Sequence, residues 1–464
     1  MILDPSAPHP NVHTDDEVLE FWEMMERMVE LTDVSQAEAN AALVGYVKRA
    51  CDNYMVYINS DPDLCRMAAI LIDSKVFKQR EEFCLSKLLS LLSIDLLELN
   101  MKFLIAYILL WDSKNNLNSL DTMLNYQGFN VFYNTCYTQF AYLRKYGEQQ
   151  EQHFTPHESE EIELRIIDDM KQISTVLLDL LFQIFKYCKC TVENVQIIDD
   201  FFVYYLMATM KSDSSNENDI FNNVKFRLSL ALNEQYMIFN RDYEIENKVY
   251  KFLCENTMHM DFPELFLLKF NRTQDNSLKI MMCKILYLIL NSTNDHISMN
   301  FFYTNDLNVF VDVMIRELQN ISDNDEILRN YYLRVLTPLL KNTELCNTHY
   351  KKDEINDLLH YLTCADHICG TDIPSQEQRL TLKLAEKCLH QVPWLETNDN
   401  DWDSDSTSAR SSITGMTPVT NFNLVDRRPP QLYSNPDTIY SAESFSKRKA
   451  RPPPPPPARK VRMP

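Results

Sequence analysis

The residues best suited to recognition chemistry lie near the end of the chain, in the sequence KRKARPPPPPPARK at 447–460. Six consecutive prolines have no amide donors and hold φ near the polyproline II value, so we expect an extended rod rather than a helix or strand. Arg451, Pro454 and Pro457 fit one orientation of an SH3-binding motif, and Pro454, Pro457 and Arg459 fit the reverse orientation. The pattern predicts an SH3 ligand; a spacer, a basic lipid-binding tail and a profilin ligand are the alternatives.

A second candidate is the acidic strip around Asp401, Trp402 and Asp403. A tryptophan among carboxylates can dock as an aromatic anchor in a pocket with a basic rim. The ordinary interpretation, which we favour, is a solvated acidic linker that could be phosphorylated at Ser404 or Ser406.

The candidates for catalysis and metal binding are weak. Cys364, His367 and Cys369, with His390 as a further ligand, resemble half of a metal site, but no second half follows at zinc-site spacing. His157 and the carboxylates after it are typical of a charged first helical turn. With no metalloprotease, hydrolase, Walker or kinase motif present, we predict a protein that is not an enzyme and has no cofactor and no metal.

Composition excludes several classes of function. Only five glycines are present, whereas nucleotide-binding loops and most β-rich folds need them for positive φ or close backbone approach. Residues 421–464 carry nine Lys or Arg and three Asp or Glu, a net charge of +6. Since the whole chain has a net charge of −21, residues 1–420 carry −27. That charge opposes nucleic acid binding. Scattered cysteines, no leader pattern, and Lys102 and Lys284 within the best apolar runs predict a cytoplasmic protein with no transmembrane segment.

The elements that must position these residues are helices. Capping boxes are predicted at Thr14–Glu17, Ser35–Glu38 and Thr155–Glu158. An apolar stripe at helical spacing runs from Ile173 to Cys188, and several later segments are apolar around more than half their circumference. Pro338 should kink or break its helix near Thr337.

These patterns predict an all-α fold, a stacked helical solenoid followed by a disordered C-terminal tail, and the family resemblance described below implies that the solenoid is armadillo-like. The expected boundaries are a disordered N-terminus at 1–12, the helical domain at 13–395, an acidic serine-rich linker at 396–420 and a basic proline-rich tail at 421–464.

The strings FFYTNDLNVFVDVMIREL and LRNYYLRVLTPLLKNTEL closely resemble the shared block of the WISH/DIP family, in particular its fungal low-dye-binding branch. The match covers roughly residues 265–360. Animal members carry an SH3 domain near the N-terminus, whereas this chain offers an SH3 ligand near its end.

The resemblance implies an armadillo-like domain that activates the Arp2/3 complex, seeds unbranched actin filaments and acts at endocytic cortical actin patches. The alternative is an endocytic scaffold that links SH3 proteins to the actin coat without activating the complex. Polar positions in the matching block are candidate contacts, although each could instead cap a helix or join neighbouring repeats. They are Asn271, Arg272, Asp306, Arg316, Arg334, Tyr350, Lys351 and Lys352.

Overall fold

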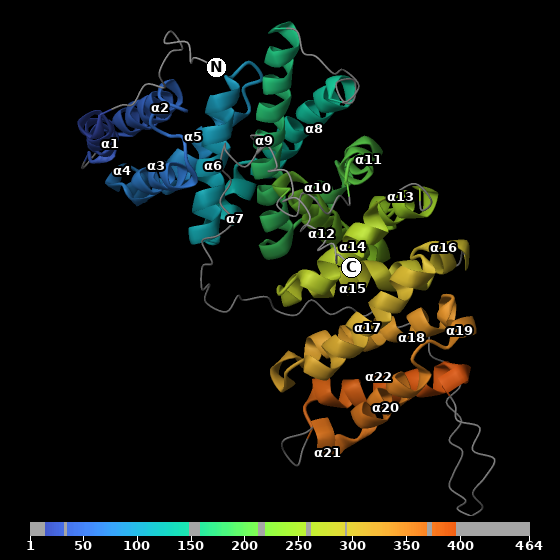
Figure 1. The fold of residues 1–464 in the computed structure, drawn as a ribbon. Coiled ribbons are helices and arrows are strands. Elements are labelled where there is room, and N and C mark those ends of the chain that lie inside the picture. The colour runs from blue at the N-terminus through green and yellow to red at the C-terminus, as the bar shows by residue number, and fades with distance from the viewer. Residues whose placement is uncertain are drawn as a thin grey trace, which may run out of the picture. The chain divides into compact units, whose positions relative to one another are not determined.

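The computed structural model describes residues 14–31, 35–147, 158–211, 219–256, 261–292, 295–368 and 374–395 (Figure 1). These residues form α-helices and two short 3-10 helices, and no strand occurs among them. The prediction of an all-α fold is therefore confirmed. The predicted domain boundaries stay predictions.

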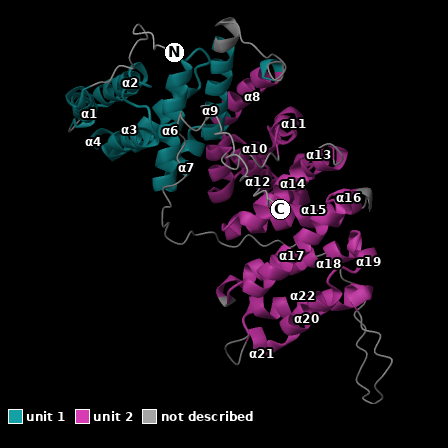
Figure 2. Cartoon of the chain, in the orientation of Figure 1, with its two compact units in different colours: residues 1–131, 145–177, 434–464 teal, residues 132–144, 178–433 magenta. Residues whose placement is uncertain are grey.

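The chain divides into two compact units (Figure 2). Among the described residues, unit 1 contains those within 14–131 and 145–177, and unit 2 contains those within 132–144 and 178–395. Unit 1 includes α1 (Asp15–Val29), α2 (Gln36–Asp52), α3 (Asp61–Asp73), α4 (Lys75–Gln79), α5 (Glu81–Leu92), α6 (Leu99–Asn115) and α7 (Asn118–Asn125). Helices α8 (Gly128–Tyr146) and α9 (Glu158–Tyr187) contribute residues to both units.

Unit 2 includes the later helices. They are α10 (Val192–Gln196), α11 (Asp200–Ala208), α12 (Ile220–Tyr243), α13 (Lys248–Asn256), α14 (Phe262–Arg272), α15 (Asn276–Leu290), α16 (Asp295–Asn300), α17 (Thr304–Asn320), α18 (Glu326–Asn342), α19 (Leu345–Thr348), α20 (Lys352–Thr363), α21 (Ala365–Ile368) and α22 (Gln376–Gln391), with the 3-10 helices η4 (Asp323–Asp325) and η5 (Pro393–Leu395).

Unit 1 is organised around α6. This helix packs against α2, α3, α5 and α7, and its residues from Lys102 to Leu110 are all buried, as its apolar circumference predicts. The capping boxes at Thr14–Glu17 and Ser35–Glu38 begin α1 and α2, so both predictions are confirmed. Thr155 lies outside the described residues.

Unit 2 contains two rows of packed helices. Helices α12, α15, α18 and α22 pack in that order, and α14, α17 and α20 form a second row beside them. Phenylalanines join the second row to its neighbours: the rings of Phe270 and Phe310 lie 4.9 Å apart, and Phe270 meets Tyr332 of α18 at 5.4 Å. The first pair is tilted and the second meets edge to face, and such ring contacts add to the burial energy of the large side chains.

Two buried ion pairs lie in the first row. Lys284 of α15 pairs with Glu234 of α12, and both side chains are almost fully buried. Arg329 pairs with Glu326, whose carboxylate also accepts a 2.6 Å hydrogen bond from Thr381 of α22. Buried charges require partners of this kind, because an unpaired charge in the core costs several kcal/mol or more.

Of the predicted kink or break near Thr337, the break is wrong, because α18 continues through Pro338 to Asn342, and the kink stays a prediction. Proline removes one backbone hydrogen bond. Pro338 is buried, and α18 packs against both α15 and α22, so the surrounding core holds the helix together across that position.

Candidate interaction surface

The outer face of α17 is the centre of the segment that the family resemblance singled out. Leu307, Phe310, Val311, Met314 and Leu318 are buried, and they follow the helical period. The opposite side of the helix presents a second set at helical spacing, which we call the α17 stripe. It consists of Asn305, Val309, Asp312 and Arg316.

Arg316 joins α17 to α14. Its guanidinium donates a 2.9 Å hydrogen bond to Oδ1 of Asn271 and lies 3.0 Å from Oε1 of Glu317. Glu317 also pairs at 2.6 Å with Lys279 of α15, which is 7% exposed. Burial alone would raise the pKa of the Glu317 carboxyl, but the hydrogen bonds from Lys279 and Arg316 outweigh it and lower that pKa. Two predicted residues, Asn271 and Arg316, are thus brought together.

Asp312 joins α17 to the turn before α20. Its carboxylate accepts a hydrogen bond of 3.2 Å from the Tyr350 hydroxyl and pairs at 3.2 Å with Lys351. Lys351 lies in the left-handed region with φ of 53°, and its ammonium also meets Glu354 at 3.0 Å. The Glu354 and Asp312 carboxylates raise the pKa of Lys351. Asp312 of α17 thus holds Tyr350 and Lys351 next to each other, in the turn before α20.

The other four predicted contacts differ in exposure. Arg272 is exposed at the end of α14, and Lys352 is half-buried at the start of α20. Arg334 is half-buried, with its guanidinium 5.4 Å from the Tyr331 ring centre. Asp306 is half-buried in the first turn of α17, where burial, with a smaller contribution from Glu264, raises the pKa of its carboxyl.

The string YTND begins α17 without capping it. Tyr303 occupies the N-cap position and makes no side-chain capping bond, and the Thr304 hydroxyl donates to Glu344. Tyr303 is 82% exposed and Val309 is 47% exposed. Neither Tyr303 nor Val309 was among the residues predicted from the sequence, nor were Asp312 and Glu317, whose carboxylates accept hydrogen bonds from predicted residues. The helical period of FVDVMIREL was the signal that could have placed Val309 on the outer side of the helix.

Several predicted residues lie outside the described residues. They are Arg451, Pro454, Pro457, Arg459, Trp402, Ser404, Ser406, His157 and Cys369. Within the described ranges, His367 stacks on the Tyr361 ring at 4.4 Å, and no group of three or more His, Cys, Asp or Glu side chains is placed to hold a metal ion. None of the helices described is long and apolar enough to span a membrane.

Comparison with known proteins places the α17 stripe within a recognised domain. Residues 218–355, from just before α12 to the start of α20, match the family model described as SPIN90/Ldb17, leucine-rich domain. The chain is 52% identical to Protein LDB17 of Saccharomyces cerevisiae, over 97% of this chain and 96% of that protein. The chain belongs to the SPIN90/Ldb17 family. All eight predicted contact positions lie within the matched domain.

Two further members of the SPIN90/Ldb17 family are similar to this chain. Protein LDB17 of Eremothecium gossypii is 47% identical over 89% of each chain. Protein dip1 of Schizosaccharomyces pombe is 30% identical over 47% of this chain and 58% of its own. Membership in this family supports a role related to actin patches and endocytosis, and none of these matches names a catalytic family.

Proposed function

We propose that this protein is a noncatalytic activator of the Arp2/3 complex that seeds unbranched actin filaments at cytoplasmic cortical patches during endocytosis. The similarity to Protein LDB17 along 97% of the chain is the observation that carries the proposal. Activation then consists of binding, and the protein shifts the complex toward its active state only by binding that state more tightly than the inactive one.

The α17 stripe and the polar residues beside it form the proposed contact with the Arp2/3 complex. Arg316 and Asp312 are held by neighbouring helices, so their side chains lose little conformational freedom on binding. Val309 lies between Asn305 and Asp312 and supplies apolar area at the centre of the stripe. A fixed polar rim around an apolar centre is the usual organisation of a protein interface.

Val309→Asp tests this surface. A buried carboxylate at the interface centre should reduce stimulation of actin assembly by about tenfold or more, without loss of helix content. Leu19→Asp is the matched control, because Leu19 is an apolar residue, 57% exposed, on α1 of unit 1. Equal activity of the two variants would exclude the α17 stripe as the contact.

The proline-rich segment at 447–460 is the proposed recruitment ligand for SH3 domains of endocytic proteins, and profilin is a second candidate partner for this segment. The alternative function is an endocytic scaffold that binds these partners and does not activate the Arp2/3 complex. Actin assembly with purified components separates the two, since only an activator shortens the lag phase when the full chain is added to actin and the Arp2/3 complex.

A further inference from the structure

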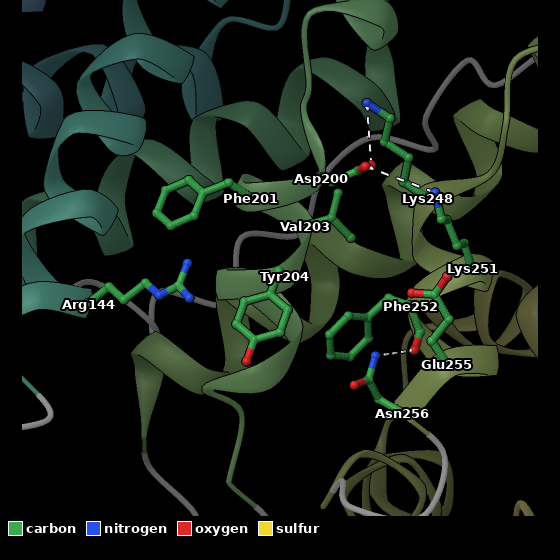
Figure 3. Close-up of a pocket in the computed structure, with 10 residues that line it drawn as sticks. All are labelled: Arg144, Asp200, Phe201, Val203, Tyr204, Lys248, Lys251, Phe252, Glu255 and Asn256. Atoms are coloured by element: carbon green, nitrogen blue, oxygen red, sulfur yellow. Dashed lines mark hydrogen bonds and ion pairs between the residues drawn. The ribbon is translucent and has the colours of Figure 1, made fainter.

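A pocket of about 360 Å³ lies in unit 2 between α11, α13 and the end of α8 (Figure 3). Its apolar lining includes Phe201, Tyr204 and Phe252. The rings of Tyr204 and Phe252 meet edge to face at 5.7 Å, and Tyr204 is 45% exposed. The size and lining fit a planar aromatic group, because such a ring can pack against both exposed ring faces and edges.

Cationic groups lie on two sides of this aromatic lining. The Arg144 guanidinium lies 5.2 Å from the Tyr204 ring centre, whereas Lys248 and Lys251 come from α13 on the other side (Figure 3). The two lysines share the Asp200 carboxylate at 3.7 and 4.0 Å, so that one acid faces two ammonium groups. Lys251 also pairs with Glu246 at 3.0 Å.

The positive charge that is not offset in this pocket belongs to Arg144. On the α13 side, Lys248 and Lys251 are offset by Asp200 and Glu246, whereas Arg144 lies over the rings of Phe201 and Tyr204 and forms no ion pair among the described residues. The ligand of the pocket should therefore be an aromatic group with a carboxylate beside it that can meet Arg144. The chain itself contains that order of groups at Asp401, Trp402 and Asp403.

The geometry points to an intramolecular contact in which the Trp402 indole occupies this pocket, packed against Tyr204 and Phe252, with Asp401 and Asp403 facing Arg144 and Lys251. Such a contact keeps the aromatic residue of the acidic strip from other partners until a competing ligand, or charge added at Ser404 or Ser406, changes its affinity for the pocket.

The strip is long enough for this contact. Trp394 donates a 3.0 Å hydrogen bond to the Leu340 carbonyl and so fixes the preceding chain against the end of α18. Helix α18 packs against α15, and α15 packs against α13 of the pocket. The axes of packed helices lie 8–10 Å apart, so the axes of α13 and α18 approach within roughly 16–20 Å of each other. The seven Cα–Cα steps from Leu395 to Trp402 extend to about 25 Å.

Tryptophan fluorescence of the full-length protein tests the contact. The difference between the wild type and Trp402→Phe isolates the emission of Trp402, which should be blue-shifted and quenched by acrylamide several-fold less than in a synthetic peptide of residues 397–406. Arg144→Glu and Lys251→Glu should each raise quenching toward the peptide value. Arg49→Glu, a charge reversal at an exposed position of α2, should leave it unchanged.

Two results would overturn the proposal. One is wild-type Trp402 that is quenched as strongly as the free peptide. The other is protection that disappears on roughly hundredfold dilution, which would assign the pocket to the strip of a second copy, since an intramolecular contact does not depend on concentration. Added salt should weaken protection in the wild type, because the flanking charges are near the surface.

Discussion

Arg316 of α17 donates a 2.9 Å hydrogen bond to Asn271 of α14, which lies 45 residues earlier in the chain. The adjacent Glu317 pairs with the buried Lys279 of α15. One turn of α17 thus fixes the relative positions of three helices. The same turn supplies Arg316 to the proposed interaction surface, so structure and recognition share these residues.

The two neighbours on this turn should differ in their effect on stability. Glu317→Gln should lower the free energy of unfolding by about 1–3 kcal/mol, because Lys279 remains buried without its anionic partner. Arg316→Ala should lower it by about 1 kcal/mol or less, because Arg316 is exposed. Urea unfolding followed by circular dichroism measures both, with Gln319→Ala, an exposed position on the same helix, as control. A larger loss of unfolding free energy for Arg316→Ala than for Glu317→Gln would contradict the view that the buried Lys279 depends on Glu317.

The carboxyl of Asp112 should make unit 1 sensitive to pH. Asp112 is 2% exposed in α6, one of its oxygens has no hydrogen-bond partner, and burial raises its pKa to about 7 against an opposing hydrogen bond from Ser119. The folded state therefore binds more protons than the unfolded state between roughly pH 4 and pH 7, so this group lowers stability as pH rises through that window, by up to about 1.4 kcal/mol per pH unit.

Asp112→Asn should remove this contribution and make the protein more stable than the wild type at pH 7.5, with the advantage shrinking as pH falls. Thermal unfolding across pH measures the difference between the two proteins. Asp121→Asn on α7 is the control, because Asp121 is exposed. Parallel stability curves for the wild type and Asp112→Asn would show that Asp112 does not carry a raised pKa.

The proline-rich segment should bind SH3 domains by itself. A peptide of residues 445–464 is expected to bind with micromolar affinity, because the polyproline conformation is largely formed before binding. Joint replacement of Arg451, Pro454, Pro457 and Arg459 by alanine should weaken binding by more than about tenfold. Titration of a panel of endocytic SH3 domains measures it; a scrambled peptide of equal charge is the control. Unchanged binding by the alanine peptide would show that the predicted motif does not direct SH3 binding, and that nonspecific charge attraction explains the interaction.

Activation and recruitment should be separable along the chain. A fragment of residues 1–396 ends just after η5 and keeps every described helix, so it should fold and stimulate the Arp2/3 complex to the extent that we propose for the full chain. In cells the same fragment should concentrate less at cortical patches, because it lacks one arm of a multivalent attachment. A soluble, helical fragment without stimulation would assign part of the activation to the residues after 396.

Local patterns in the sequence predicted the helices well. Thr14 and Ser35 begin helices as their capping boxes indicate, because those bonds join residues three apart. Of the kink or break predicted near Thr337, the break was wrong, since packing by neighbouring helices outweighs one lost hydrogen bond. The contacts of Arg316 and Asp312 could not be predicted, because their partners lie 38 to 45 residues away and meet them only through tertiary packing.

Imaging of single actin filaments tests the central claim most directly. Purified full-length protein, the Arp2/3 complex and actin monomers are combined without preformed filaments or a WASP-type activator. The activator that we propose should increase the number of new filaments, each of them unbranched, and Val309→Asp should not. Filament numbers equal to those with the Arp2/3 complex alone, from protein that is folded and binds the complex, would contradict activation and favour the scaffold.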